Sequence, residues 1–191
     1  MNMIIPQPIF GKVPIDMHGY SIWRQIISIW KNPPCFYLLE DWHVTLADGT
    51  EIVIPKGFIT DFASIPRVLW PIIEPDGPLC VGSILHDFGY QHGYFLTLFK
   101  ENVKYEEAAL ALRVSAPDKF GKYIPYYTDQ PQIFFDGLLR DATIQLTGAT
   151  VQAKEAYVAL RGFGYRAWDN YRAKGPGAFG CNSLGLPGRT K

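Results

Sequence analysis

His86 and Asp87 place a titratable base directly beside a carboxylate, within the segment ILHDFGYQHGY of residues 84–94. A histidine side chain titrates near neutrality (pKa about 6.5), so it can accept a proton from water and act as a general base. In a helix, Tyr90 shares a face with His86, while Asp87 is rotated by about 100° toward a different neighbour. The pattern predicts that His86 activates water and that Asp87 holds a cation or a backbone group.

A base of this kind needs a second carboxylate to fix its tautomer, and two segments supply candidates. The segment 133–147 reads as a helix and offers Asp136 and Asp141. Asp61 lies in GFITDFASIPR, as part of a short polar island within an apolar run. Asp61 either caps a local turn or faces the same pocket as Asp87. The competing interpretation of the whole pattern is a structural helix whose polar groups are satisfied internally.

The elements that position these residues indicate an α+β fold, with a small antiparallel β-hairpin or sheet packed against several helices. Residues 36–46 carry alternating apolar residues, Asp48-Gly49 offers a tight turn, and residues 51–54 run back. Helices are expected over 79–93, 103–114, 133–147 and 151–162, and residues 20–31 have the spacing of an amphipathic segment. Residues 115–131 read as a loop rich in tyrosine.

The domain organisation follows from composition. We expect an irregular N-terminal arm and first amphipathic segment at residues 1–35, one α+β domain at 36–168, and a Gly/Pro-rich C-terminal arm at 169–191. Lys plus Arg and Asp plus Glu both number 18, so no net charge favours a nucleic-acid partner. The most apolar stretch is interrupted by Arg24, Lys31 and two prolines, which argues against a transmembrane segment.

Two separated motifs carry a resemblance to a known group of proteins. VIPKGFITDFASIPR at residues 53–67 precedes LHDFGY at 85–90, and an Asp-bearing helix follows at 133–147. Over about residues 36–168 the chain resembles a family of uncharacterised proteins encoded mainly by tailed bacteriophages and prophages. This resemblance implies expression in a bacterial host cytoplasm and assembly into a virion, with no activity attached.

HDFGY alone is similar to the active-site helix of bacterial and fungal secreted phospholipases A2. That resemblance implies that His86 is the general base, that Asp87 is a calcium ligand, and that Tyr90 supports an orienting carboxylate, for which Asp136 is the best candidate. The chain lacks an evident Gly-rich calcium loop, so Asp61 and backbone carbonyls of residues 57–64 would have to replace it. Calcium needs six to eight oxygen ligands in general, and the sequence offers two or three.

Three functional hypotheses stay open on these grounds. The first is a virion-associated protein of tail or baseplate type, in which His86, Asp136 and Tyr90 form a hydrolase site for a bacterial envelope component, with Asp87 and Asp61 binding calcium or another divalent cation. The second is a purely structural virion or assembly protein, whose terminal arms bind other phage proteins or copies of itself. The third is a soluble phospholipase A2-like or metal-dependent hydrolase, with His43 or His92 as an extra metal ligand.

Overall fold

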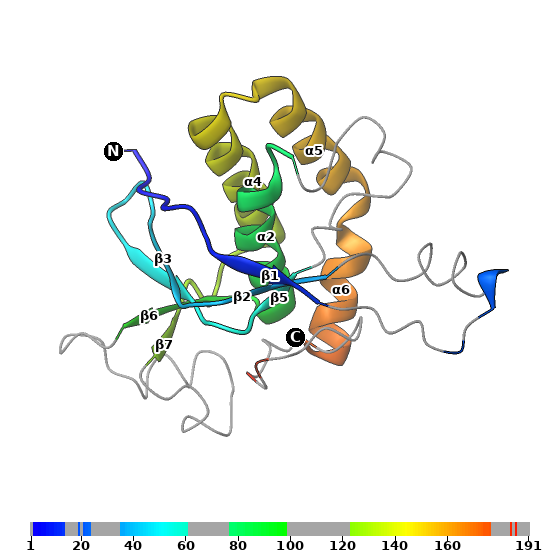
Figure 1. Cartoon of the computed structure of the whole chain (residues 1–191). Coiled ribbons are helices and arrows are strands. Elements are labelled where there is room, and N and C mark those ends of the chain that lie inside the picture. Colours follow the sequence, from blue (N-terminus) through cyan, green and yellow to red (C-terminus); the bar gives the residue numbers. More distant parts are fainter. Residues whose placement is uncertain are drawn as a thin grey trace.

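The fold is an α+β arrangement in which two small antiparallel sheets pack beside a group of helices (Figure 1). The structure is a computed structural model, and it describes residues 2–13, 19, 21–23, 35–60, 77–98, 123–176, 184 and 186. The amphipathic segment expected over 20–31 lies mostly outside these residues, and the helix expected over 103–114 lies wholly outside them. None of the helices within the described ranges is long and apolar enough to cross a membrane.

The first sheet has the order β1-β2-β5 and the second has the order β3-β4-β6-β7. The strands of the first are Phe10–Lys12, Phe36–Leu38 and Ile59–Thr60; those of the second are Trp42–Thr45, Glu51–Ile54, Phe95–Leu98 and Tyr123–Tyr126. The predicted hairpin is confirmed, because Trp42 pairs with Ile54 and Thr45 with Glu51 across a turn that contains Gly49 in a left-handed conformation. Gly49 is suited to this turn because it lacks the Cβ that makes a positive φ costly.

Helix α2 (Cys80–His92) lies at the centre of the helical group (Figure 1). Every residue of α2 except Val81 is buried, so the helix has no solvent face. Its C-terminus is closed by Gly93 at φ 80°, whose N–H donates to the carbonyl of Gly89, as the sequence predicts for a glycine stop. A helix buried all round must satisfy its polar side chains inside the protein, and this requirement shapes the candidate site.

Three further helices complete the helical group. Helix α4 (Gln132–Thr147) packs along α2, α5 (Thr150–Phe163) packs on α4, and α6 (Tyr165–Lys174) contacts α2 and α5. The closest approach is between α2 and α4, where a Cβ at Gly89 would fall on the ring of Phe135 and one at Gly82 would meet the Leu139 carbonyl. The absence of side chains at these two positions therefore permits the contact.

The strands differ from the sequence prediction in three places. Residues 36–46 do not form one strand, because β2 ends at Leu38 and β3 begins at Trp42 in the other sheet. The tyrosine-rich segment expected to be a loop contains β7, and β6 follows α2 without having been predicted. The last described helix, α6, runs from Tyr165 to Lys174, so it spans the predicted boundary between the domain and the C-terminal arm at residue 169.

Candidate functional site

His86 lies in α2 between two carboxylates. Its Nε2 is 3.1 Å from Oδ1 of Asp136 on α4, and its Nδ1 is 3.4 Å from Oδ1 of Asp87. The imidazole ring also packs on Tyr90, with ring centroids 3.8 Å apart. The structure thus brings together His86, Asp87, Tyr90 and Asp136, four of the residues to which the sequence assigned a chemical role.

Asp136 is fully buried and accepts hydrogen bonds from several elements. Its Oδ1 accepts from the Tyr90 hydroxyl at 2.6 Å as well as from His86, and its Oδ2 accepts from Nη1 of Arg161 on α5 at 2.8 Å. Gln132 donates in turn to the Tyr90 hydroxyl at 2.7 Å. Such a set of donors is matched to an ionised carboxylate, which only accepts.

These contacts shift the pKa values of the network in a consistent way. Burial lowers the pKa of His86, but hydrogen bonds and charges from Asp136 and Asp87 raise it more, so the pKa lies above its ordinary value. Burial raises the pKa of Asp136, but the hydrogen bond and charge of His86, with Tyr90 and Arg161, bring it below its ordinary value. Burial, followed by the Asp136 charge, raises the pKa of Tyr90. Tyr90 therefore stays a neutral donor.

The tautomer of His86 follows from the state of Asp136. An ionised Asp136 has no proton to donate, so Nε2 of His86 must carry the proton that joins them. In the neutral ring the lone pair then lies on Nδ1, on the side of Asp87. One nitrogen is thus fixed by a carboxylate, as in a general base, while the other lies 3.4 Å from Oδ1 of Asp87 in the buried interior.

Asp87 is 5% exposed and has one oxygen toward His86 and the other bonded by the Thr60 hydroxyl. No group of three or more metal-binding side chains occurs among the residues that the structure describes. Asp87 and Thr60 do not by themselves fit calcium, which takes six to eight oxygen ligands. Asp61, the second predicted ligand, lies outside the described residues.

The other predicted candidates lie apart from this network. Asp141 is half exposed and binds its neighbour Arg140 at 2.7 Å, so Asp136 is the carboxylate that contacts His86. His43 lies in the β3–β4 hairpin and binds Glu51 at 3.0 Å, with both side chains exposed. His92 is buried at the end of α2, with its ring 4.6 Å from that of Phe88.

Sequence reasoning missed two arginines and one glutamine. Arg161 and Gln132 complete the network around Asp136 and Tyr90, and Arg172 on α6 is buried with Nη2 2.6 Å from the Tyr90 carbonyl and 3.2 Å from that of Gln91. The cation of Arg172 thus lies at the negative end of the α2 dipole. The available signal for Arg161 was its position in the helix that follows the helix of Asp136. The sequence alone does not show which faces of these two helices contact each other.

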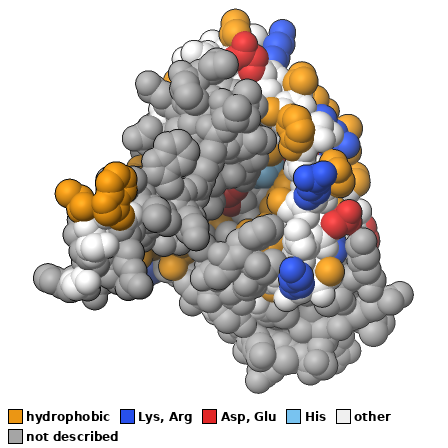
Figure 2. Space-filling view, turned by 90° about the vertical axis from the view of Figure 1, so that its right-hand side faces the viewer, with side chains coloured by type: hydrophobic (Ala, Val, Ile, Leu, Met, Phe, Trp, Pro, Cys, Tyr) orange, Lys and Arg blue, Asp and Glu red, His pale blue; other side chains and the backbone are white. Residues whose placement is uncertain are grey.

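Solvent access to the network is narrow. His86 and Asp136 have no exposed surface, whereas the Arg161 side chain is 37% exposed. Figure 2, which looks at the side where α5 and α6 lie in Figure 1, shows a histidine and an acidic side chain at the bottom of a hollow in the surface. Arg161 is thus the member of the network that links the buried carboxylate to solvent.

The fold and the network belong to an α+β domain whose interior is organised around a histidine and carboxylates. The model of one family, described as a protein of unknown function (DUF1353), matches residues 36–160, and the chain belongs to this family. The matched range contains His86, Asp87, Tyr90, Gln132 and Asp136, and it ends one residue before Arg161. No curated protein and no solved structure matches the chain.

Proposed function

We propose that this protein is a hydrolase in which His86 activates water, with Asp136 and Tyr90 as its positioning residues. The observation that carries the proposal is the bond from His86 Nε2 to a buried carboxylate that Tyr90 and Arg161 also hold. A structural histidine can be satisfied by backbone groups and does not need a carboxylate. Here one nitrogen is fixed by a network spread over three helices, which is what control of a tautomer requires.

The reaction that this geometry supports is hydrolysis of an ester or amide. Nδ1 of His86 takes a proton from water while the water oxygen forms a bond to the carbonyl carbon. The bond from that carbon to the leaving oxygen or nitrogen then breaks, and the imidazolium returns the proton to the leaving group. Asp136 stays ionised and stabilises the imidazolium, as the lowered pKa of its carboxyl supports.

The proposed setting is a tailed bacteriophage particle, assembled in the host cytoplasm, with a lipid or cell-wall component of the bacterial envelope as substrate. Support for the setting is the pair of motifs at residues 53–67 and 85–90 and their resemblance to phage and prophage proteins. Support for the substrate is the resemblance of HDFGY to the phospholipase A2 helix, together with the bond from Tyr90 to Asp136, which is the role that this resemblance implies.

The test compares hydrolysis by the wild-type chain and three variants, on p-nitrophenyl butyrate, on phosphatidylglycerol vesicles and on purified peptidoglycan. His86→Gln and Asp136→Asn should lose at least about 100-fold in rate, the usual contribution of a general base. His43→Gln is the matched control, because His43 also binds a carboxylate but is exposed. Because the pKa of His86 is raised, the rate should increase with pH through a value above about 6.5. Equal rates for wild type and His86→Gln on all three substrates would refute catalysis.

A divalent cation at Asp87 and Asp61 is a separate part of the proposal, and the hydrolysis above is written without it. Its support is the charge of Asp87 beside the Thr60 hydroxyl. Metal analysis of purified wild type and Asp87→Asn, each dialysed against calcium, tests it. A stoichiometric calcium content that falls in Asp87→Asn supports the site, and equal contents in the two proteins reject it.

The complete burial of His86 favours a second candidate, a non-catalytic virion or assembly protein. In this case the network joins α2, α4 and α5, and the terminal arms bind neighbouring subunits. Removal of residues 177–191 takes away the buried Leu186, so circular dichroism must first show that the shortened chain still folds. Its incorporation into particles should then be reduced. Unchanged incorporation would reject the role of the C-terminal arm.

A further inference from the structure

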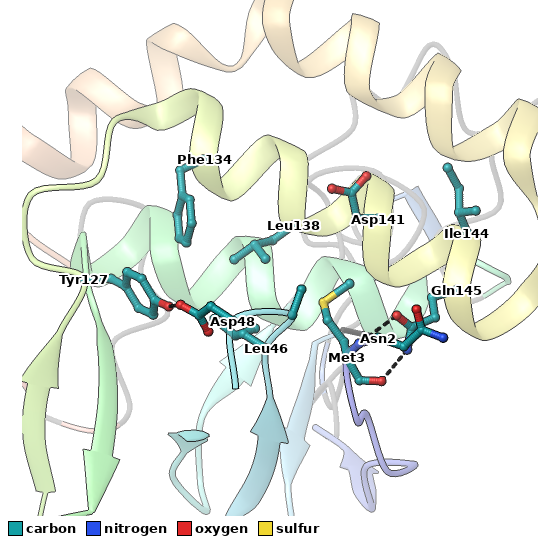
Figure 3. Close-up of a pocket in the computed structure, with 11 residues that line it drawn as sticks. Asn2, Met3, Leu46, Asp48, Tyr127, Phe134, Leu138, Asp141, Ile144 and Gln145 are labelled. Atoms are coloured by element: carbon teal, nitrogen blue, oxygen red, sulfur yellow. Dashed lines mark hydrogen bonds between the residues drawn. The ribbon is translucent and has the colours of Figure 1, made fainter. Parts of the chain in front are cut away.

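A cavity of about 510 Å³ lies away from His86, between α4 and the β3–β4 hairpin. This volume is within the range of about 300–1,000 Å³ that is usual for small-molecule sites. Figure 3 shows the side chains around it, which come from the N-terminal segment, the hairpin turn, the end of β7 and one face of α4. The opposite face of α4 carries Asp136, so the helix separates this cavity from the His86 network.

The walls of the cavity are mainly apolar and aromatic. Met3, Leu46 and Leu138 contribute aliphatic surface. Tyr127 and Phe134 stand beside one another with ring centroids 5.2 Å apart. Two adjacent aromatic faces next to an aliphatic wall are the elements from which proteins build sites for alkylated ammonium groups, because the ring face is negative.

The rim of the cavity carries an ionised carboxylate. The hydrogen bond from the Tyr127 hydroxyl, followed by that from the Thr50 N–H, lowers the pKa of Asp48, so its charge persists at neutral pH. Both of these partners are neutral, and no described Lys, Arg or His forms an ion pair with Asp48. Asp141, the other carboxylate at the cavity, is already paired with Arg140. Among the described residues that line it, the cavity therefore has one unbalanced negative charge, on Asp48, which a cationic ligand would balance.

Tyr127 is held in a conformation that supports a binding role. It is the one non-glycine residue at positive φ (56°) among the described residues, and such backbone is costly for a tyrosine. Strain of this kind tends to persist where a side chain must be aimed at a ligand. Here it places the Tyr127 ring beside Phe134 and its hydroxyl on Asp48, as Figure 3 shows.

We propose that this cavity binds an organic cation with an apolar tail, of the alkylammonium or quaternary ammonium class. The ammonium group lies against Tyr127 and Phe134 within reach of Asp48, and the tail lies along Leu46, Leu138 and Met3. This site is independent of the proposed hydrolysis, and its test is a binding measurement that uses no activity.

The experiment titrates the full-length protein with octyltrimethylammonium below its micelle concentration, by isothermal titration calorimetry. One site per chain is expected, and octyl sulfate, with the same tail and the opposite charge, should bind at least about tenfold more weakly. Asp48→Asn keeps the hydrogen-bond acceptor and should weaken binding about 3- to 30-fold, the range of a charge or cation-π contact. Asp129→Asn is the matched control, an exposed carboxylate outside the cavity, and should bind like wild type.

Two further variants keep the test decisive if Asp48→Asn folds poorly. Ala47→Trp fills the cavity from an exposed turn position and should abolish binding. Tyr127→Asn suits the left-handed backbone and removes the ring, so it should weaken binding, and the relief of backbone strain offsets part of the packing lost against Phe134. Equal binding of octyl sulfate, unchanged binding in Ala47→Trp, or adsorption of many ligands per chain would overturn the proposal.

Discussion

Asp136 is the residue on which the interior polar network depends. It has no exposed surface, and its two oxygens accept from His86, Tyr90 and Arg161. A buried carboxylate with such partners is tolerated because each donor compensates for lost hydration. Removal of its charge leaves those donors without a matched acceptor. A change at this one side chain therefore weakens the contacts among α2, α4 and α5.

Asp136→Asn should lower the free energy of unfolding by about 3–5 kcal/mol, the usual cost of breaking a buried ionic network. Asp141→Asn is the matched control on the same helix, because Asp141 is exposed and pairs with Arg140. It should change stability by less than about 1 kcal/mol. Urea denaturation of the three proteins measures both effects, and similar losses in the two variants would contradict the central role of Asp136.

The titration of His86 predicts a dependence of stability on pH. Its pKa is raised in the folded protein, so the folded state binds the proton more tightly than the unfolded chain. The stabilisation is fully present below about pH 6.5, the unfolded pKa, and is lost as the pH rises through the folded pKa.

The difference in unfolding free energy between wild type and His86→Gln should therefore be largest below about pH 6.5 and should shrink toward alkaline pH. Urea denaturation of both proteins between pH 5.5 and 9 measures it. A constant difference over this range would show that His86 does not titrate with a raised pKa.

At the scale of the elements, the contact between α2 and α4 brings His86 and Asp136 together. This contact depends on Gly89, where a Cβ would fall on the buried ring of Phe135. On an open helix surface the same substitution would be favourable by about 1 kcal/mol, because alanine favours helix. At this position the steric clash with Phe135 disfavours alanine, while its helix propensity favours it.

Gly89→Ala should lower the free energy of unfolding by about 1–3 kcal/mol, the range for overpacking in a core. Gly137→Ala is the matched control, because nothing lies within 4 Å of its Cβ position in α4. It should leave stability unchanged or raise it by up to about 1 kcal/mol. Thermal unfolding of both variants tests the pair, and a stabilised Gly89→Ala would show that the two helices can move apart freely.

Some of the helices and strands could be predicted from the sequence, and others could not. The hairpin and helices α2 and α4 were predictable because Asp48-Gly49, Gly93 and Gly148 mark their turns and ends locally. Strand β6 was not, because Phe95–Leu98 is a short apolar run whose partners are distant in sequence. His86, Asp87, Tyr90 and Asp136 were candidates by residue type. The choice of Asp136 over Asp141, and the presence of Arg161, depend on which helix faces meet.

For the whole molecule, helix α6 stabilises a domain whose matched family range ends before it. Arg172 bonds the carbonyls at the end of α2, and the Trp168 ring lies 5.4 Å from Tyr90 and 5.6 Å from Phe135. These contacts join α6 to both α2 and α4 beside the network.

A chain that ends at residue 160 should therefore fold poorly or be less stable, since it lacks Arg161 and all of α6. A chain that ends at residue 176 keeps both but loses the buried Leu186, so it should be more stable than the shorter fragment and somewhat less stable than the full chain. Circular dichroism during heating compares the two fragments. Full stability of the shorter fragment would show that α6 does not contribute to the stability of the domain.

The burial of α2 on nearly all sides has a consequence for how the protein opens. Its amide protons have no nearby surface, so a local fluctuation does not bring them to deuterated solvent. They exchange only when the surrounding helices separate, which is the unfolding of the domain as a whole. The rate of isotope exchange along Cys80–His92 therefore reports global stability, while the ends of α5 and α6 exchange first.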